Sequence, residues 1–241
     1  MPGVPSDSIE VESGGEGKRS DIGAPFRSIG RCQFHSPSSR SSDAYATPGE
    51  DPSQARRQAV DLDKQEGEET MTTTLSRLET ERALLDETIA GIDDAAMTEE
   101  GTPGAWSVKD LVARIAVWDR RGLRWIDEAV HGTVPHIPEP GLTFADMDRL
   151  NEQTFVEHRE RPLVEVLAEY RDASERLLAR VRKLTPEDLA RSFSLGQPDV
   201  ADPMTVERLV AWRWHHYAEH GYEIRRWIAQ RRPDSSAAAT R

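Results

Sequence analysis

Two histidines four positions apart, His216 and His220, are the residues of this chain best suited to chemistry. On a helix, residues i and i+4 are neighbours on one face, so the two imidazoles would lie side by side. Two nitrogens placed in this way can hold one face of a divalent metal ion and leave positions for a third ligand and for water or substrate. They can also move protons as acid or base. Such pairs are often merely packed or solvated, so the spacing alone indicates only a candidate site.

A faint internal repeat predicts which way these histidines point. Residues Ser107–Ala113 and Thr205–Ala211 match at the capping residue, at both valines, at leucine and at alanine. The repeat aligns His216 with Trp118, which lies on the apolar stripe of the earlier helix, and it places His220 on the same stripe. Convergence of good helix starts or two related helix pairs would each explain the likeness. In both cases the two imidazoles are predicted to point inward.

The segment that must position the histidines is predicted to be an all-α fold. From Thr74 onward, apolar residues recur at three- and four-residue spacings, which is typical of helices that bury one face. We expect an antiparallel (up-down) four-helix bundle with short extra helical turns. The expected helices run from Thr74 to about Ile92, from Ser107, from Thr143 to near Arg161, from Pro162 through Leu184, and from Thr205 to about Ala229, with a short turn at Thr185.

The composition argues against several classes of protein. The 241 residues carry a formal net charge of −12, whereas binding to nucleic acid or anionic lipid needs clustered Lys and Arg. No run reaches the roughly 18 apolar residues of a membrane span, and the N-terminus lacks the basic start and apolar core of a secretory signal. A cytoplasmic location is therefore expected. The single cysteine, Cys32, excludes an intramolecular disulfide and leaves the helical part without a thiol.

The chain is predicted to divide into a tail (1–70), a bundle (71–232) and a second disordered tail (233–241). Residues 1–70 are rich in Ser, Gly, Pro, Asp and Glu and keep no apolar period. Such a segment cannot bury enough apolar surface to offset backbone ordering, which costs roughly 1–2 kcal/mol per residue. We expect it to be disordered, with a regulatory or partner-binding tail as an alternative. A third reading is that translation begins at Met71, which opens a run typical of bacterial starts.

Two segments resemble the DinB/YfiT-like superfamily of four-helix bundles. Trp106–Trp118, with the sequence WSVKDLVARIAVW, is similar to the signature of the second helix in that family, and His216–His220 is similar to its last helix. The likeness extends over essentially the whole of residues 71–232. The middle of the chain most resembles the ClbS/DfsB-like branch, in the segments Pro135–Phe144, Leu150–Glu152 and Leu163–Leu167.

This resemblance implies a bundle that often holds a divalent metal ion with three histidines, one on the second helix and two on the last. By resemblance, His216 and His220 are metal ligands. The family pattern puts the third histidine where this chain has Arg114. A guanidinium stays protonated and has no lone pair, so Arg114 cannot be a ligand and would repel a nearby cation. His158 and Asn151 are the candidate replacements.

Without a metal ion, the same residues predict a pocket for an anionic or aromatic small molecule. The candidate catalytic residues are the two histidines, as bases or residual metal ligands, and Arg114, which would hold an anion. The alternative is a purely structural role, in which the tryptophans are core residues and Arg114 extends past apolar neighbours to solvent. The candidate substrate-binding residues are Arg114, Trp118, Asn151, Arg213 and Tyr217.

Three functions are compatible with this pattern, and whether the chain is an enzyme stays open. Relatives implied by the resemblance include thiol-dependent transferases and isomerases of the maleylpyruvate isomerase type, and ClbS-like proteins that protect against a genotoxic metabolite. The first hypothesis is a hydrolase or transferase acting on a reactive metabolite, with a divalent metal (Zn or Ni) or a low-molecular-weight thiol as cofactor. The second is a non-catalytic binding or sequestering protein. The third is a structural or partner-binding bundle, as a homodimer. The expected partner is a small molecule rather than nucleic acid or a membrane.

Overall fold

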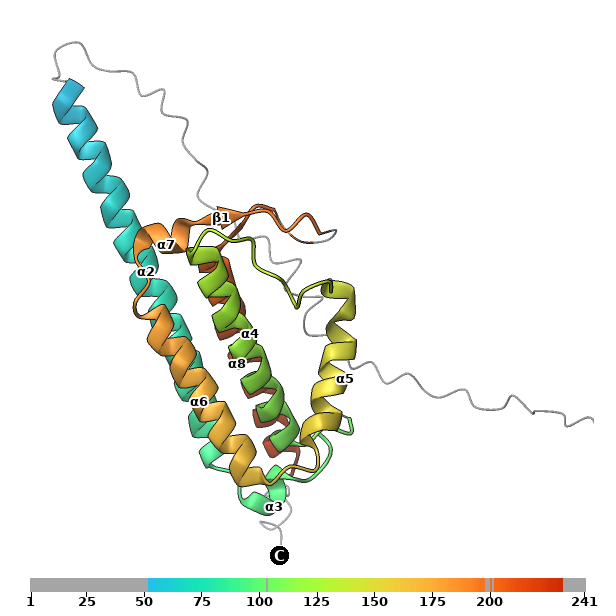
Figure 1. The fold of residues 1–241 in the computed structure, drawn as a ribbon. Helices are drawn as coiled ribbons and strands as arrows, with labels where there is room; N and C mark the ends of the chain where they lie inside the picture. The colour runs from blue at the N-terminus through green and yellow to red at the C-terminus, as the bar shows by residue number, and fades with distance from the viewer. Residues whose placement is uncertain (1–51, 103, 198–199, 201, 232–241) are drawn as a thin grey trace, which may run out of the picture.

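Helices make up nearly all the regular structure of the protein (Figure 1). The computed structural model describes residues 52–102, 104–197, 200 and 202–231, so the tails predicted over residues 1–51 and 233–241 lie outside the described residues. The elements are α2 (Pro52–Ala90), α3 (Asp94–Met97), α4 (Val108–Val130), the 3₁₀ turn η1 (Phe144–Asp146), α5 (Met147–His158), α6 (Leu163–Val181), α7 (Pro186–Ala190), β1 (Ser192–Phe193), β2 (Met204–Thr205) and α8 (Val206–Arg231). The predicted all-α class is confirmed, since β1 and β2 form only a two-residue antiparallel pair. Among the described helices, none is long and apolar enough to cross a membrane.

Two helices, α4 and α7, begin where the sequence supplies a cap. At α4, the hydroxyl of Ser107 accepts the backbone N–H of Asp110, and the carboxylate of Asp110 accepts the backbone N–H of Ser107. Thr185 and Asp188 form the same capping box at α7. Each cap satisfies backbone donors that a helix start would otherwise leave unpaired. These starts agree with the predicted ones because a cap involves only residues close together in the sequence.

Helix α2 begins earlier than its apolar pattern predicts. The pattern indicates a start at Thr74, whereas α2 begins at Pro52 and continues through residue 70 without a break. For residues 52–70 the structure therefore differs from the predicted disorder. This stretch holds several Gln, Ala, Arg, Glu and Lys residues, which have high helix propensity, and extending an existing helix avoids the cost of nucleating a new one.

Four long helices form the bundle, in which α4 packs against both α6 and α8, and α2 packs against both α8 and α6. An up-down order would make every neighbouring pair antiparallel, but α4 and α6 run parallel. Arg120 pairs with Glu169 near the middle of both helices, and Asp127 pairs with Arg180 toward both C-terminal ends. The reason is α5, which returns the chain along the bundle before α6 begins (Figure 1).

The other two long helices, α2 and α8, are also parallel to each other. The guanidinium of Arg77 lies 5.3 Å from the ring centroid of Trp214, and farther along Arg225 donates to Thr88. The bundle is therefore two parallel pairs packed against each other in opposite directions. As a result α4 and α8, which carry the residues singled out from the sequence, are antiparallel neighbours.

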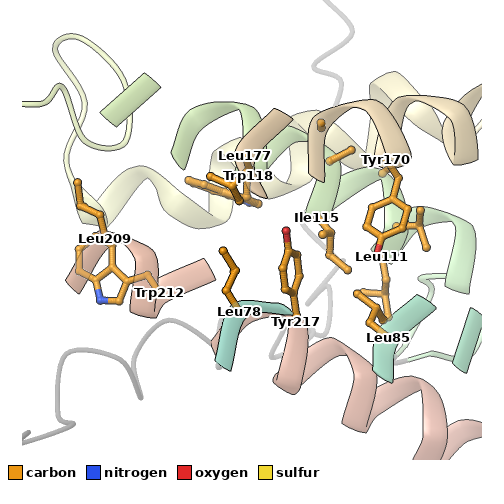
Figure 2. Close-up of a cluster of buried hydrophobic side chains, with 14 of the residues drawn as sticks. Leu78, Leu85, Leu111, Ile115, Trp118, Tyr170, Leu177, Leu209, Trp212 and Tyr217 are labelled. Carbon is orange, nitrogen blue, oxygen red and sulfur yellow. The ribbon is translucent and has the colours of Figure 1, made fainter. Parts of the chain in front are cut away.

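The core is built from the predicted apolar stripes. Figure 2 shows side chains from the four long helices meeting in the bundle, and each of those named next is at most 2% exposed. Burying a large apolar side chain contributes about 1.5–3 kcal/mol, so this cluster is the main source of stability. Its members include Leu78 and Leu85 of α2, Leu111 and Ile115 of α4, Tyr170 and Leu177 of α6, and Leu209 and Tyr217 of α8.

A glycine on α4 allows close contact with α8. A Cβ atom added to Gly122 would lie 2.6 Å from Cδ and 3.2 Å from Nε of Arg213, whose side chain is fully buried. Arg213 also donates from Nη1 to the carbonyl of Trp118, at 2.8 Å. The missing side chain at residue 122 therefore makes the room that the buried guanidinium occupies.

We expect Gly122→Ala to lower the free energy of unfolding by about 1–3 kcal/mol, because the new methyl group overpacks a rigid buried site. Gly221→Ala is the matched control on α8. Its added Cβ would meet the outer end of Arg225, an exposed side chain that can move, so the gain in helix propensity should leave stability equal or higher. Urea unfolding of both variants measures this, and equal losses would contradict the role given to Gly122.

Candidate functional site

The two histidines of α8 are buried and contact each other. His216 and His220 are both 0% exposed, which confirms the predicted inward position, and their Nε2 atoms lie 3.0 Å apart. At this distance one nitrogen donates a hydrogen and the other accepts it. Burial lowers the pKa of both imidazoles, that of His216 well below its usual range, and the neighbouring Arg114 adds to both shifts. Both rings are therefore neutral at neutral pH.

Glu223, one turn farther along α8, decides which nitrogen carries the hydrogen. Its Oε2 lies 2.7 Å from Nδ1 of His220, so Nδ1 carries a hydrogen that the carboxylate accepts. The Nε2 lone pair of His220 then accepts the Nε2 hydrogen of His216. Burial opposes ionisation of Glu223, but the hydrogen bond from His220 keeps its pKa below the ordinary value. The three side chains form a hydrogen-bonded chain from the buried His216 to the half-buried Glu223.

Arg114 brings a buried positive charge next to this chain. Its side chain is 3% exposed, and its Cζ lies 5.6 Å from the ring centroid of Trp106. Burial lowers the pKa of Arg114, while the charges of Glu223, Glu219 and Asp148 act in the opposite direction. Among the described residues, neither Nε nor Nη2 has a hydrogen-bond partner. An unpaired buried donor costs about 1–3 kcal/mol, and more when it is charged, so this arrangement destabilises the folded state.

A second carboxyl group, that of Glu219, completes what we call the Arg114 cluster: Arg114, His216, Glu219, His220 and Glu223. Burial and the charge of Glu223 raise the pKa of Glu219 to about 7, against the opposing effect of Arg114. The four α8 residues occupy positions i, i+3, i+4 and i+7, which form one face of a helix. Sequence analysis identified the two histidines of this helical face but missed Glu219 and Glu223, although the same spacing places all four residues on one face.

The donor set does not fit the three-ligand metal centre that the resemblance implies. The Nε2 atoms of His216 and His220 converge, as two ligands of one ion would. The third position holds the guanidinium of Arg114, which has no lone pair. Across the part of the chain that the structure describes, no group of three His, Cys, Asp or Glu side chains could hold a metal ion. Two imidazoles beside a buried cation are a poor site for a second cation.

The candidate replacements for the third ligand are engaged elsewhere. Asn151 accepts a hydrogen bond from Nε1 of Trp118 at 2.8 Å, and both side chains are buried. Nδ1 of His158 lies 2.9 Å from the carbonyl of Thr154, and its Nε2 lies 3.7 Å from a carboxylate oxygen of Glu169. These contacts tie α5 to its neighbours, and they bring neither candidate to the histidine pair.

The remaining predicted substrate-binding residues belong to a second buried cluster, on the core side of α8. The hydroxyl of Tyr217 donates to Oδ2 of Asp119 at 2.7 Å, and both side chains are nearly or fully buried. Burial raises the pKa of Asp119 to about 7, against the opposing charge of Arg213. Arg213 and Tyr217 thus both act on Asp119 inside the fold. Tyr217 does not take part in the Arg114 cluster. Sequence analysis missed Asp119, whose signal is its position four residues after Ile115 and three before Gly122, on the buried side of α4.

Two cavities of the described structure lie away from both clusters. One, of about 580 Å³, lies between α2 and α8 and is lined by Leu84, Thr88 and Ile228 among others. The other, of about 460 Å³, lies between α2 and α6 and is lined by Asp86 and Tyr170 among others. In the Arg114 cluster the guanidinium and both imidazoles are buried, and the half-buried carboxyl groups of Glu219 and Glu223 are the parts that reach solvent.

Comparison with known proteins supports the resemblance derived from the sequence. The family model of the DinB superfamily matches residues 77–224, which is more than half of the chain. Among curated proteins no match is found. The predicted family is thereby confirmed.

Solved structures of DinB-like proteins share the fold. The sibling lethal factor precursor DfsB is 19% identical over 68% of this chain and 98% of its own, with a TM-score of 0.55. The colibactin self-resistance protein ClbS, solved with double-stranded DNA, is 16% identical over 65% of this chain and 93% of its own, with a TM-score of 0.54. A mycothiol-dependent maleylpyruvate isomerase mutant is 10% identical over 64% of this chain and 60% of its own, with a TM-score of 0.53. At these identities the likeness shows the fold alone.

The raised pKa of Asp119 predicts a specific pH dependence of stability. Between about pH 4 and pH 7 the folded chain keeps a proton on Asp119 that the unfolded chain has released. This contribution to the free energy of unfolding is complete at the acidic end and is lost as the pH rises through about 7, by up to about 1.4 kcal/mol per pH unit. Asp119→Asn cannot ionise, so denaturant unfolding across this range should show the stability difference, wild type minus variant, falling as pH rises. Parallel pH profiles would contradict the prediction, because all other titrating groups are common to both proteins.

Replacing the guanidinium with a third imidazole should create a metal site. We expect Arg114→His to raise the affinity for Co²⁺ by at least about tenfold, since it removes a repelling charge and adds a nitrogen ligand. Calorimetric titration of protein without a histidine tag measures the change, with the double variant Arg114→His, His216→Ala as the control. An unchanged affinity in Arg114→His would mean that residue 114 does not face the histidine pair.

Proposed function

Because the chain belongs to the DinB superfamily, we propose that it binds a small anionic molecule at the Arg114 cluster, without a metal ion. The observation that carries this proposal is the buried guanidinium of Arg114, whose Nε and Nη2 have no partner among the described residues. The charges of Glu223, Glu219 and Asp148 act on this guanidinium, but none of these carboxyl groups bonds to Nε or Nη2. A ligand with negatively charged oxygens would satisfy both donors and offset the cost of burying them.

The two neutral imidazoles add hydrogen-bonding capacity to the same site. With Glu223 they form a chain that can pass a proton between the interior and solvent, through changes of tautomer at His220 and His216. This chain favours one further candidate function, a metal-independent hydrolase or transferase acting on a reactive metabolite. A low-molecular-weight thiol would suit the transferase form, because the described helices contain no cysteine that could serve as nucleophile.

Nucleic acid is a less suitable partner for this chain, although the ClbS structure contains double-stranded DNA. The formal net charge is −12, and the single strong cation of the cluster is buried among carboxyl groups. Phosphate backbones are bound by exposed, clustered Lys and Arg. The small-molecule function therefore accounts better for where the charges of this protein lie.

We expect at least one small anion to raise the melting temperature of the wild-type protein and to leave that of Arg114→Gln unchanged. The panel for this thermal-shift experiment is acetate, methanesulfonate, phosphate and a low-molecular-weight thiol. Binding to the folded state stabilises it by RT ln(1 + [L]/Kd), or about 2.7 kcal/mol at a ligand concentration of 100 Kd.

Arg120→Gln is the matched control for this experiment. Arg120 lies on the same helix but is partly exposed and paired with Glu169, so its loss removes the same charge away from the cluster. The control should respond to the anion as the wild type does. A panel without any shift, or equal shifts in wild type and Arg114→Gln, would count against the proposed function.

A further inference from the structure

The two nitrogens of Arg114 that lack a partner among the described residues lie on the same edge of the guanidinium. Nε–H and Nη2–H point in nearly the same direction, so together they present two parallel donors. This spacing matches the two oxygens of a carboxylate, which can accept both hydrogens in the plane of the guanidinium. The Cζ atom of Arg114 lies 5.6 Å from the ring centroid of Trp106, and the edge that carries Nε and Nη2 makes no hydrogen bond to the described residues.

The charges around Arg114 limit the charge of the ligand. Three carboxyl groups act on its guanidinium: Glu219 and Glu223 from α8 and Asp148 from α5. A dianion such as phosphate would meet repulsion from all three, and the imidazoles of His216 and His220 are neutral and cannot compensate. One guanidinium already faces more than one acidic group, so the cluster repels added negative charge. A monoanion adds less negative charge than a dianion and is therefore repelled less.

Arg213 provides an internal comparison. Its Nε and Nη2 also have no hydrogen-bond partner within the described residues, and it is fully buried. Burial lowers the pKa of Arg213, and the charge of Asp119 opposes this lowering most strongly. Asp119 is itself fully buried in the core. The acidic neighbours of Arg114 on α8, in contrast, are half-buried and reach solvent. Of the two guanidiniums, only that of Arg114 therefore has neighbours past which a small ligand could approach.

We propose that the Arg114 cluster binds a small planar monocarboxylate, held side-on by Nε and Nη2 of Arg114, with the carboxyl groups of Glu219 and Glu223 at the solvent side. This inference rests on the proposed function and names its ligand class. A sulfonate has the same charge but a tetrahedral head, so its third oxygen lies outside the plane shared by the guanidinium and the two bonded oxygens and needs more room. A carboxylate has no such oxygen.

The experiment compares acetate, methanesulfonate and phosphate as probes by calorimetric titration of the full chain. We expect acetate to bind at least about tenfold more tightly than methanesulfonate, and phosphate to bind more weakly than either. Arg114→Lys should lose at least about tenfold in acetate affinity and less in methanesulfonate affinity, because an ammonium group keeps the charge but not the parallel pair of donors. Arg120→Lys is the matched control and should leave both affinities unchanged.

A direct readout comes from the Nε–H resonance of Arg114 in the wild-type protein, assigned by its loss in Arg114→Lys. Acetate should shift this resonance downfield in a saturable way, with the same midpoint as the heat signal. The titration itself uses only the wild-type protein.

The outcomes separate the two proposals. Methanesulfonate or phosphate binding as tightly as acetate, with the binding lost in Arg114→Gln, would overturn the carboxylate inference and leave the small-anion function standing. Acetate binding that survives Arg114→Lys unchanged, or that does not move the Nε–H resonance, would also overturn the inference. An absence of binding by all three probes would overturn both proposals.

Discussion

The guanidinium of Arg114 is buried between α4 and α8 with three carboxyl groups near it and none bonded to its Nε or Nη2. This charge acts on every other member of the Arg114 cluster, in which burial is the largest influence on each pKa. It helps to keep the two imidazoles neutral, and it opposes the mutual repulsion of Glu219 and Glu223 on one face of α8. It also occupies the position at which a third metal ligand is expected. A fold that keeps a costly buried cation in this place gains most when an anion is bound there.

Close contact between α4 and α8 encloses a second guanidinium, that of Arg213. The two helices are antiparallel and approach closely at Gly122, where the missing side chain leaves room for Arg213. On the core side of α8, Asp119 and Tyr217 bond to each other in the neighbourhood of Arg213. The last helix thus separates two polar clusters, one enclosed in the bundle and one bordered by groups that reach solvent. The second is the cluster at which we propose that a small anion binds.

Membership of the DinB superfamily accounts for the fold of the protein. The chemistry of its site depends on residues particular to this chain. DfsB, ClbS and the maleylpyruvate isomerase share the bundle at identities of 19%, 16% and 10%, which are too low to transfer a site. The histidine pair of α8 fits the family pattern, whereas Arg114 departs from it. We propose that a permanent cation in place of a neutral ligand makes this site prefer an anion to a metal ion.

Much of the fold was predictable from the sequence because its signals are local. The caps at Ser107 and Thr185, the apolar stripes and the inward phase of His216 and His220 all depend on residues within a few turns of each other. The spacing of His220 and Glu223 already placed them on one helical face, so their contact was within reach of the same reasoning.

Only the tertiary structure decided the rest. The parallel course of α4 and α6, the engagement of Asn151 by Trp118 and the approach of Arg213 to Gly122 join residues far apart in the chain. The same holds for Arg114, whose sequence neighbours cannot reveal whether its guanidinium reaches solvent, a carboxylate or neither. Such contacts depend on how each helix is rotated and shifted against its neighbour. Packing of all the helices together determines these two quantities, and no single segment encodes them.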